Sequence, residues 1–530
     1  MRIITERLGR RSLLRLAALA ASLFLIPSAF AESTLKVALH SDLKIIDPIW
    51  TTALISTHHG MMVYDTLFSL DEKLTVQPQM VDKWSLSEDK LTWTFTLRDG
   101  LEWHDGQPVT AEDCVASIKR WSARDGMGQK LMSFVADIKP TDARTFFMRM
   151  KEPYGLVLAT LGKSTSNFPF MMPKRVADTD PGTQITDPVG SGPFIFKKEE
   201  WKPGEKAVYV KNPKYKPRAE PPSGFAGGKV VKVDRVEWIW IADPQTQVNA
   251  LLNGEIDFIE APPHDLLPLL VRDPNVKLLV VAPMGRQYAF RFNVLHKPFD
   301  IPKVRQAVAY ALNQKDFLNA TIGDAEYYVT CKSLYPCGSP FETTKGWDDK
   351  LESNFAKAKA LLKEAGYDDT PVVLMQSTDI ASLSNLAPVA KSLMEKAGLK
   401  VDLQAMDWQT LVSRRAKKDP LNAGGWSAYL TSWGGVDVLD PVSTNFLNAS
   451  CEKATFGWPC DAELERLRDA FAKETDPAKQ KSIAEAVSVR ASQYPTHVVL
   501  GQYLQPSAFR KNIEGVLVAS NVAFWNIEKK

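Results

Sequence analysis

Residues 97–110 read LRDGLEWHDGQPVT and combine the residue types that perform acid–base catalysis. Glu102, His104 and Asp105 lie within four positions, and a carboxylic acid beside an imidazole can donate and accept protons near neutral pH. The same stretch also fits a turn, because two Asp-Gly dipeptides flank the histidine and such dipeptides favour tight turns. The turn gives each acidic residue a local structural role. We therefore predict a turn here and no active site.

Other motifs of enzymes and metal sites are incomplete in this chain. LGKST at 161–165 lacks the earlier glycine of a phosphate-binding loop, and GSG at 190–192 does not continue into a dinucleotide-binding motif. Of the seven histidines only His58 and His59 are adjacent, and neighbours on a helix point about 100° apart. The sequence therefore predicts no enzyme, no cofactor and no metal site, although a histidine such as His59 could line a cleft.

The elements that must position any site alternate between strands and helices. Residues 91–100 alternate apolar side chains with threonine, as a half-buried strand does, and a helix is expected after Thr110 as its N-cap. Residues 301–322 have the pattern of one amphipathic helix. Near the end, 461–495 is typical of two helices and 496–505 of a strand. This alternation predicts an α/β architecture.

The first 31 residues have the composition of an export signal. A basic start precedes an apolar run of eleven residues, and Ala29 and Ala31 complete a cleavage site of the A-x-A type. Eleven apolar residues cannot span a bilayer, which needs about 20. GRRSLLR at 9–15 leaves the twin-arginine route open beside general secretion. Because Glu32 and not cysteine follows the cleavage site, we expect a soluble periplasmic protein and no lipoprotein.

The cysteines fit the oxidising periplasm. Cys331 and Cys337 are six positions apart and Cys451 and Cys460 are nine apart, so each pair could close a short loop. Four cysteines allow three pairings and the sequence alone does not choose among them, but local pairing is the pattern that we predict. Cys114 would stay free as a small buried side chain in a helix.

The charge of the chain argues against a nucleic-acid partner. Residues 1–31 hold five arginines and one glutamate, so 60 basic and 61 acidic residues remain after them, a formal net charge of −1. A nucleic-acid-binding surface needs basic residues clustered on one face. The densest basic cluster, RRAKK at 414–418, is interpreted as the solvated end of a helix. The Pro- and Gly-rich segment at 217–230 is interpreted as a long surface loop.

Four segments together resemble the extracellular solute-binding proteins of the dipeptide, oligopeptide and nickel class, which is family 5. TFTLRDGLEWHDGQPVTAEDCVASIKRW at 94–121 is similar to the signature segment of that family, with Cys114 in place of the usual valine. The segments at 64–95, 187–196 and 298–317 resemble further family motifs in the same order. The chain is therefore identified as a member of this family over essentially its whole mature length.

The resemblance implies an α/β fold of two lobes that close on a solute like a clamshell, with an extra subdomain inserted in the first lobe and with no catalytic residues. The expected boundaries are 32–62, 188–286 and 494–530 for lobe I, 63–187 for the inserted subdomain, and 287–493 for lobe II.

The resemblance also implies the periplasmic receptor of an ABC importer. Such a receptor is expected to be a monomer without a cofactor that delivers a small peptide or peptide-like solute to an inner-membrane permease and its ATPase subunits. In peptide-binding relatives an aspartate shortly after a tryptophan pairs with the amino terminus of the peptide. Here Asp437 follows Trp433 one position later than in that pattern. This departure leaves a non-peptide solute open, such as an opine, heme, a nickel chelate or a sugar. A periplasmic chaperone and a secreted hydrolase are alternatives of other classes.

Five residues are candidate ligand contacts. Asp437 would neutralise an ammonium group, because a buried unpaired charge is costly. Arg286 would meet a carboxylate, and Trp433 and Trp408 would provide flat apolar walls. His59 would line the cleft. Asp437 could instead be a turn residue, Arg286 part of a surface ion pair, and the two tryptophans part of the core.

Overall fold

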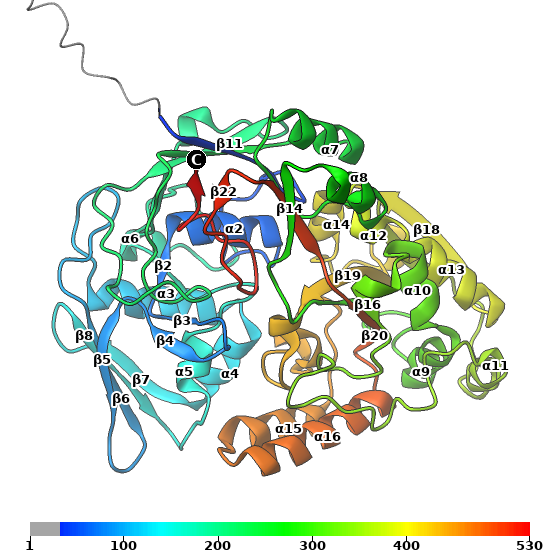
Figure 1. The fold of residues 1–530 in the computed structure, drawn as a ribbon. Coiled ribbons are helices and arrows are strands. Elements are labelled where there is room, and N and C mark those ends of the chain that lie inside the picture. Colours follow the sequence, from blue (N-terminus) through cyan, green and yellow to red (C-terminus); the bar gives the residue numbers. More distant parts are fainter. Residues whose placement is uncertain (1–31) are drawn as a thin grey trace, which may run out of the picture. The chain divides into compact units, whose positions relative to one another are not determined.

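The computed structural model describes residues 32–530, of which Thr34–Lys530 form one compact unit (Figure 1). The signal peptide predicted at 1–31 lies outside the described residues. Helices and strands alternate along the unit, and most strands gather in two large sheets, which confirms the predicted α/β class. Within the described range, no helix has both the length and the apolar character that crossing a membrane requires.

The first large sheet is the centre of what we call lobe I. Its strand β1 (Thr34–Ala38) runs parallel to both neighbours, β12 (Arg235–Ile239) and β13 (Phe258–Ile259). Leu35 and Val37 are fully buried and alternate with exposed Lys36, the period of two that a strand imposes. The remaining strands are β10 (Phe194–Phe196), β11 (Lys206–Lys211), β14 (Val276–Val280) and β21 (Pro506–Arg510), and the helices are α2 (Leu54–Val63), α7 (Pro244–Asn253) and α8 (Leu267–Arg272).

The second large sheet is the centre of lobe II. Its strand β15 (Arg286–Phe292) runs antiparallel to β19 (Ala428–Gly434) and β20 (His497–Tyr503). The chain passes from β20 directly into β21, so its last part returns to lobe I. The remaining strands are β16 (Tyr328–Val329), β17 (Val372–Ser377) and β18 (Val401–Met406), and the helices are α9 (Pro302–Ala311), α10 (Gln314–Thr321), α11 (Phe355–Glu364), α12 (Ala381–Ser384), α13 (Leu386–Lys396), α14 (Trp408–Arg414), α15 (Ala462–Lys473) and α16 (Pro477–Gln493).

A four-stranded antiparallel sheet forms the subdomain between β1 and β10 in the sequence. The strand predicted at 91–100 is β6 (Thr92–Leu97), and α3 (Ala111–Ser122) begins after Thr110. The Thr110 hydroxyl accepts the Asp113 N–H and the Asp113 carboxylate accepts the Thr110 N–H, which is a capping box. The boundaries predicted for the lobes and the subdomain stay predictions. The other elements here are β5 (Val81–Leu86), β7 (Val135–Pro140), β8 (Thr145–Met150) and α4 (Gly126–Phe134), with β2 (Asp65–Thr66), β3 (Phe68–Leu70), β4 (Val76–Pro78), β9 (Phe170–Met171), α5 (Val157–Leu161) and α6 (Lys174–Ala177) nearby in the chain.

Two predictions about local structure are wrong. The single helix predicted at 301–322 is two helices, α9 and α10, because the Asn313 side chain accepts the Lys315 N–H and caps α10. The segment at 217–230 is only partly a surface loop. Phe225 is buried against Phe168 and Trp525 and draws the second half of the segment into the core of lobe I.

The LRDGLEWHDGQPVT stretch is a turn, as predicted. Gly100 and Gly106 have φ values of 67° and 86°, which glycine adopts without the strain that other residues incur. Glu102 forms a surface ion pair with Lys214 at 3.3 Å. The ring of His104 is close to the GSG segment, with Nε2 3.1 Å from a carbonyl oxygen of that segment. Burial lowers the pKa of His104 to about 4. The imidazole therefore holds two loops together as a neutral group.

The cysteines pair locally, as predicted. Cys331 is joined to Cys337 and Cys451 to Cys460, and both loops belong to lobe II. Cys114 is free and fully buried in α3. Burial raises the pKa of its thiol, so it serves as core packing.

Candidate functional site

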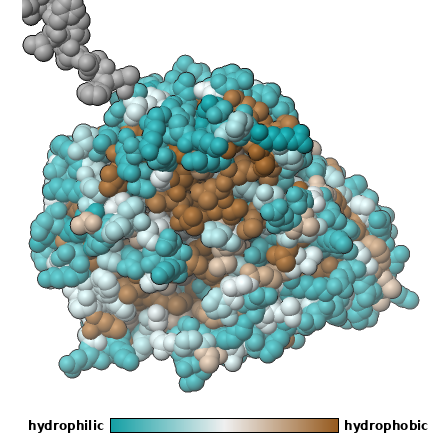
Figure 2. Space-filling view, viewed as in Figure 1, coloured by the Kyte–Doolittle hydropathy of each residue, from teal (hydrophilic) through white to brown (hydrophobic). Residues whose placement is uncertain are grey.

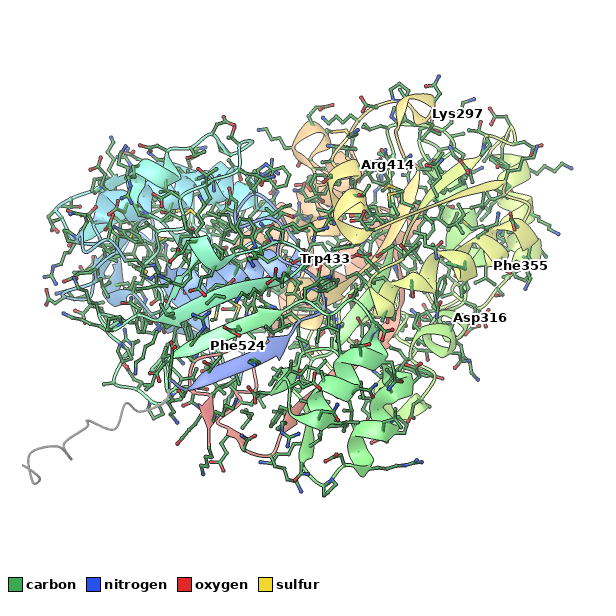
Figure 3. All side chains as sticks on the ribbon, turned by 90° about the horizontal axis from the view of Figure 1, so that it is seen from above. Lys297, Asp316, Phe355, Arg414, Trp433 and Phe524 are labelled. Carbon is green, nitrogen blue, oxygen red and sulfur yellow. A yellow bond between two sulfur atoms is a disulfide. The ribbon has the colours of Figure 1, made fainter. Side chains whose placement is uncertain are left out.

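A cavity of about 130 Å³ lies between lobe I and lobe II. Lobe II provides β19 and the short turn η5 (Gly435–Val438) that follows it, and lobe I provides the segment after β1, including His40. Figure 3 places Trp433, near the end of β19, between the two lobes. A hollow of about 430 Å³ shares His40 and Ala261 with this cavity, and another of about 320 Å³ shares Ala282 and Ser520 with it. On the face shown in Figure 2, apolar residues gather in the middle and hydrophilic residues surround them.

Asp437 lies in η5 and faces the cavity with a buried carboxylate that is 8% exposed. Its Oδ2 accepts the Gly434 N–H at 3.1 Å, and its Oδ1 accepts the Ser166 N–H at 2.7 Å. Ser166 lies between α5 and β9, so the second bond joins lobe II to the opposite wall. The carboxylate forms no ion pair with another residue of the described chain, and its oxygens have capacity for a further donor.

Arg286 begins β15 and lines the same cavity. It lies opposite Gly434 in the register of β15 with β19, which brings it to the same end of the sheet as the η5 turn. The side chain is half-buried, and its Nε donates to the Ser432 hydroxyl at 3.2 Å. Among the described residues it has no carboxylate partner. The cavity is therefore lined by unpaired groups of opposite charge.

Two tryptophans form walls of the cavity. Trp433 packs edge-on against Phe446, with ring centroids 5.2 Å apart, and its indole N–H is buried without an acceptor in the described part of the chain. Trp408 begins α14 and is 8% exposed. Both rings present apolar surface, and Trp433 also presents an unused donor to a solute.

His59 lies outside the cavity, which corrects the expectation that it lines a cleft. Its ring is fully buried in lobe I, where Nδ1 lies 2.9 Å from the Tyr209 hydroxyl and the ring packs edge-on against Phe196. The physical reason is the helical geometry of α2, which turns adjacent side chains in different directions. His58 is the one that points toward the cavity wall, with Nε2 3.6 Å from Glu260.

Arg415 lines the cavity, although the RRAKK cluster was interpreted as a solvated helix end. It is 3% exposed and lines the cavity, whereas Arg414 is half-buried and is absent from the cavity lining. Arg415 follows Trp408 by seven positions and Leu411 by four, and residues at these spacings share one face of a helix. That spacing is the signal in the sequence that identifies the buried arginine.

Known proteins are similar to this chain over nearly its full length. The family described as bacterial extracellular solute-binding proteins, family 5 (middle), matches residues 75–455. The chain belongs to this family. A probable peptide ABC transporter periplasmic-binding protein, y4tO of Sinorhizobium fredii, is 40% identical over 535 residues, covering 98% of this chain and 99% of that protein.

Solved structures show the same fold. AgaA of A. tumefaciens R10, in complex with agropinic acid, has a TM-score of 0.80 and 22% identity, covering 94% of this chain and 99% of that chain. A dipeptide-binding protein of Pseudoalteromonas sp. SM9913, in complex with Met-Leu, has a TM-score of 0.78 and 19% identity, covering 94% and 100%. Solute-binding proteins of this family are two-lobed transport receptors, which confirms the family resemblance and the predicted architecture.

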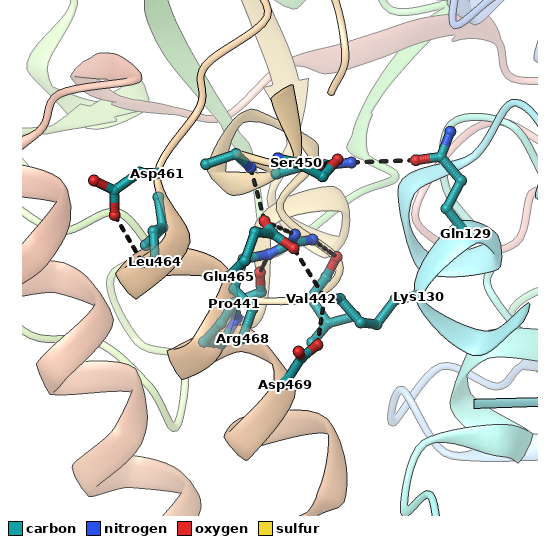
Figure 4. A network of polar contacts seen from close by, with 12 residues as sticks. Gln129, Lys130, Pro441, Val442, Ser450, Asp461, Leu464, Glu465, Arg468 and Asp469 are labelled. Carbon is teal, nitrogen blue, oxygen red and sulfur yellow. Dashed lines mark hydrogen bonds and ion pairs between the residues drawn. The ribbon is translucent and has the colours of Figure 1, made fainter. Parts of the chain in front are cut away.

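In this solute-binding protein a polar network joins the subdomain to lobe II (Figure 4). Lys130 of α4 forms ion pairs with Glu465, at 2.9 Å, and with Asp469, both on α15. Glu465 also accepts a hydrogen bond from Nη1 of Arg468. The Nε of Arg468 donates a second hydrogen bond to the Pro441 carbonyl at 2.9 Å. The network lies away from the cavity lining and holds the two walls in contact. In a protein whose two lobes close on a solute, ion pairs of this kind stabilise the closed arrangement.

His40, His58 and Glu260 meet beside the cavity of the solute-binding protein. Their ring nitrogens and carboxylate lie within 4.8 Å of one another, which is a group that could hold a metal ion. His40 Nδ1 lies 2.6 Å from Glu260, so the carboxylate already has a strong hydrogen-bond partner. Both ring nitrogens of His58 are buried without a hydrogen-bond partner in the described residues, although Nε2 lies 3.6 Å from Glu260. These three residues therefore form a polar cluster in lobe I, and His40 and Glu260 of the cluster line the cavity.

The buried histidines predict a loss of stability in mild acid. Burial lowers the pKa of His58 to about 4 and the pKa values of His59 and His497 to about 3, against about 6.5 in an unfolded chain. Between about pH 6.5 and 4 the unfolded state therefore binds more protons than the folded state. The free energy of unfolding should fall in this window by about 1.4 kcal/mol per pH unit for each buried histidine.

Urea unfolding at about pH 7 and about pH 5 measures this effect. In His59→Gln, one titrating group is removed, so the difference between the two pH values should be smaller than in the wild type by about 2 kcal/mol. Equal unfolding free energies of the wild type at the two pH values would contradict the prediction.

Proposed function

We propose that this chain is the periplasmic receptor of an ABC importer and that it captures a small peptide-like solute between its lobes. The observation that carries the proposal is that two groups without an ion-pair partner in the described chain, the Asp437 carboxylate and the Arg286 guanidinium, line one cavity at the same end of the lobe II sheet. A zwitterionic solute supplies the opposite charges, since its ammonium meets Asp437 and its carboxylate meets Arg286. Trp433 and Trp408 enclose its apolar part.

The family and the relatives support this function. A relative at 40% identity is a probable peptide ABC transporter periplasmic-binding protein, and one with the same fold was solved with the dipeptide Met-Leu. The receptor hands its solute to an inner-membrane permease and its ATPase subunits, acts as a monomer and catalyses no reaction. The export signal predicted at 1–31 directs it to the periplasm.

Mass spectrometry of the purified mature protein tests the proposal. We expect one small solute with a free amine to be released on denaturation, and intact peptides from a defined mixture to be retained at one per protein. Cleaved peptides would indicate a hydrolase, and retention of unfolded protein would indicate a chaperone. A released heme, sugar or nickel chelate without a free amine would replace the peptide-like solute and leave the receptor role in place.

A further inference from the structure

Arg415 is a buried cation on the wall of the cavity. Its guanidinium carbon lies over three aromatic rings, at 5.8 Å from the Trp408 centroid, 5.7 Å from Tyr429 and 4.9 Å from Phe456. The rings hold the planar group in one orientation but supply no hydrogen-bond acceptor in its plane. The side chain is therefore fixed with its N–H groups directed elsewhere.

Most of the hydrogen-bonding capacity of Arg415 is unused. A guanidinium carries five N–H donors, and here only Nη2 has an acceptor, the Thr52 hydroxyl of lobe I at 2.7 Å. Its Nε is buried without a partner in the described chain, and no carboxylate of that chain pairs with it. A charge buried in this way normally requires an anion nearby.

The other buried arginines of the described chain are bonded more fully than Arg415. Each of them donates at least two hydrogen bonds to carboxylate or carbonyl oxygens, including the bidentate contact of Arg120 with Asp47 and the carbonyl contacts of Arg291 with Phe446 and Phe456. Arg415 alone among these buried arginines donates one bond, to a hydroxyl, and it alone of them lines the cavity. We therefore expect a bound solute to provide the hydrogen-bond acceptor that Arg415 lacks.

We propose that Arg415 and Thr52 form a second anion subsite and that the natural solute is an acidic amine with two carboxylates, such as a peptide that contains Glu or Asp. This inference rests on the proposed function. In such a complex the ammonium pairs with Asp437, one carboxylate with Arg286 and the other with Arg415. Glu260 keeps His40 as its own partner, so every charged group on the cavity wall has a counterpart.

Calorimetry with two matched pairs of dipeptides tests the subsite. Ala-Glu is compared with Ala-Gln, and Glu-Ala with Gln-Ala, because each pair differs by one negative charge at nearly constant shape. In at least one pair the acidic member should bind about tenfold to a hundredfold more tightly, the ratio typical of a charge-assisted hydrogen bond. Arg415→Gln should reduce this preference to about threefold or less.

Three further variants separate the subsite from general effects. Arg414→Gln is the matched control, because Arg414 donates to the Gly424 and Gly425 carbonyls and does not line the cavity, so the preference should persist. Arg415→Lys keeps the charge and should retain part of the preference. Should Arg415→Gln not fold in a thermal melt, Thr52→Val provides the test, and it should weaken the acidic member selectively.

Each outcome decides the inference. Binding of the neutral and acidic members within about threefold of each other would overturn the second subsite while leaving the peptide receptor in place. If none of the four dipeptides binds, the solute released from the purified protein decides, and fewer than two acidic groups on it would overturn the subsite. A released solute without a free amine would instead contradict the peptide-like solute of the proposed function and leave the receptor role in place.

Discussion

Asp437→Asn should weaken the binding of a peptide with a free amino terminus by about 10²- to 10³-fold. The wild-type carboxylate is buried, lines the cavity and has no ion-pair partner in the described chain. Removing its charge would leave the ammonium of the solute buried and unpaired, and breaking one side of a buried charge pair costs about 3–5 kcal/mol. Calorimetry of wild type and variant with the same peptide measures the difference.

Two controls make this result specific. An N-acetylated peptide lacks the ammonium, so it should bind the wild type weakly and gain little from the substitution. Asp440→Asn changes a carboxylate of the same loop that accepts the Val442 and Ser443 N–H groups and does not line the cavity, so it should leave affinity unchanged. If Asp437→Asn binds the peptide within about threefold of wild type, Asp437 serves only the η5 turn and its bond to Ser166.

Arg120→Met should lower the free energy of unfolding by about 3–5 kcal/mol. Arg120 of α3 is 2% exposed and donates to both oxygens of Asp47, at 3.2 and 2.8 Å, and Asp47 is fully buried. Arg120 also donates to the Thr183 carbonyl at 3.0 Å. The substitution therefore leaves a buried carboxylate without its cation at the contact between the subdomain and lobe I. Urea unfolding of the wild type and the variant measures the loss when the two proteins have the same m-value.

Arg175→Met is the matched control for this effect. Arg175 pairs with Asp105 at 3.0 Å, but its side chain is 50% exposed. An ion pair of that kind contributes about 0–1 kcal/mol, so the control should unfold close to the wild type. A loss below about 1 kcal/mol in Arg120→Met would show that the backbone N–H groups around Asp47 suffice to stabilise its charge.

Much of the local structure could be predicted because short-range chemistry decides it. Thr110 and Asp113 stand three residues apart, and their reciprocal bonds fix the start of α3 wherever that helix packs. The glycines of the LRDGLEWHDGQPVT stretch define its turn in the same way, since they tolerate a positive φ. Cys331 and Cys337 lie close enough in sequence for their loop to close locally. The four family motifs, found in the order typical of the family, then predicted the two-lobed fold and the role of a transport receptor.

The site depends on contacts that join distant parts of the chain, and only the tertiary structure decides these. Ser166 reaches Asp437 across 271 positions, and Thr52 reaches Arg415 across 363. Local patterns carry no information about such pairs. They also could not tell which of His58 and His59 lies against the cavity-lining residue Glu260, because that depends on how α2 is rotated against the sheet of lobe I. The sequence by itself determined most of the elements and the family, whereas it predicted one helix where α9 and α10 are two. Packing by three aromatic rings of lobe II and by Thr52 of lobe I decided that Arg415 is a cavity residue, since a charge is solvated or enclosed only according to what packs over it.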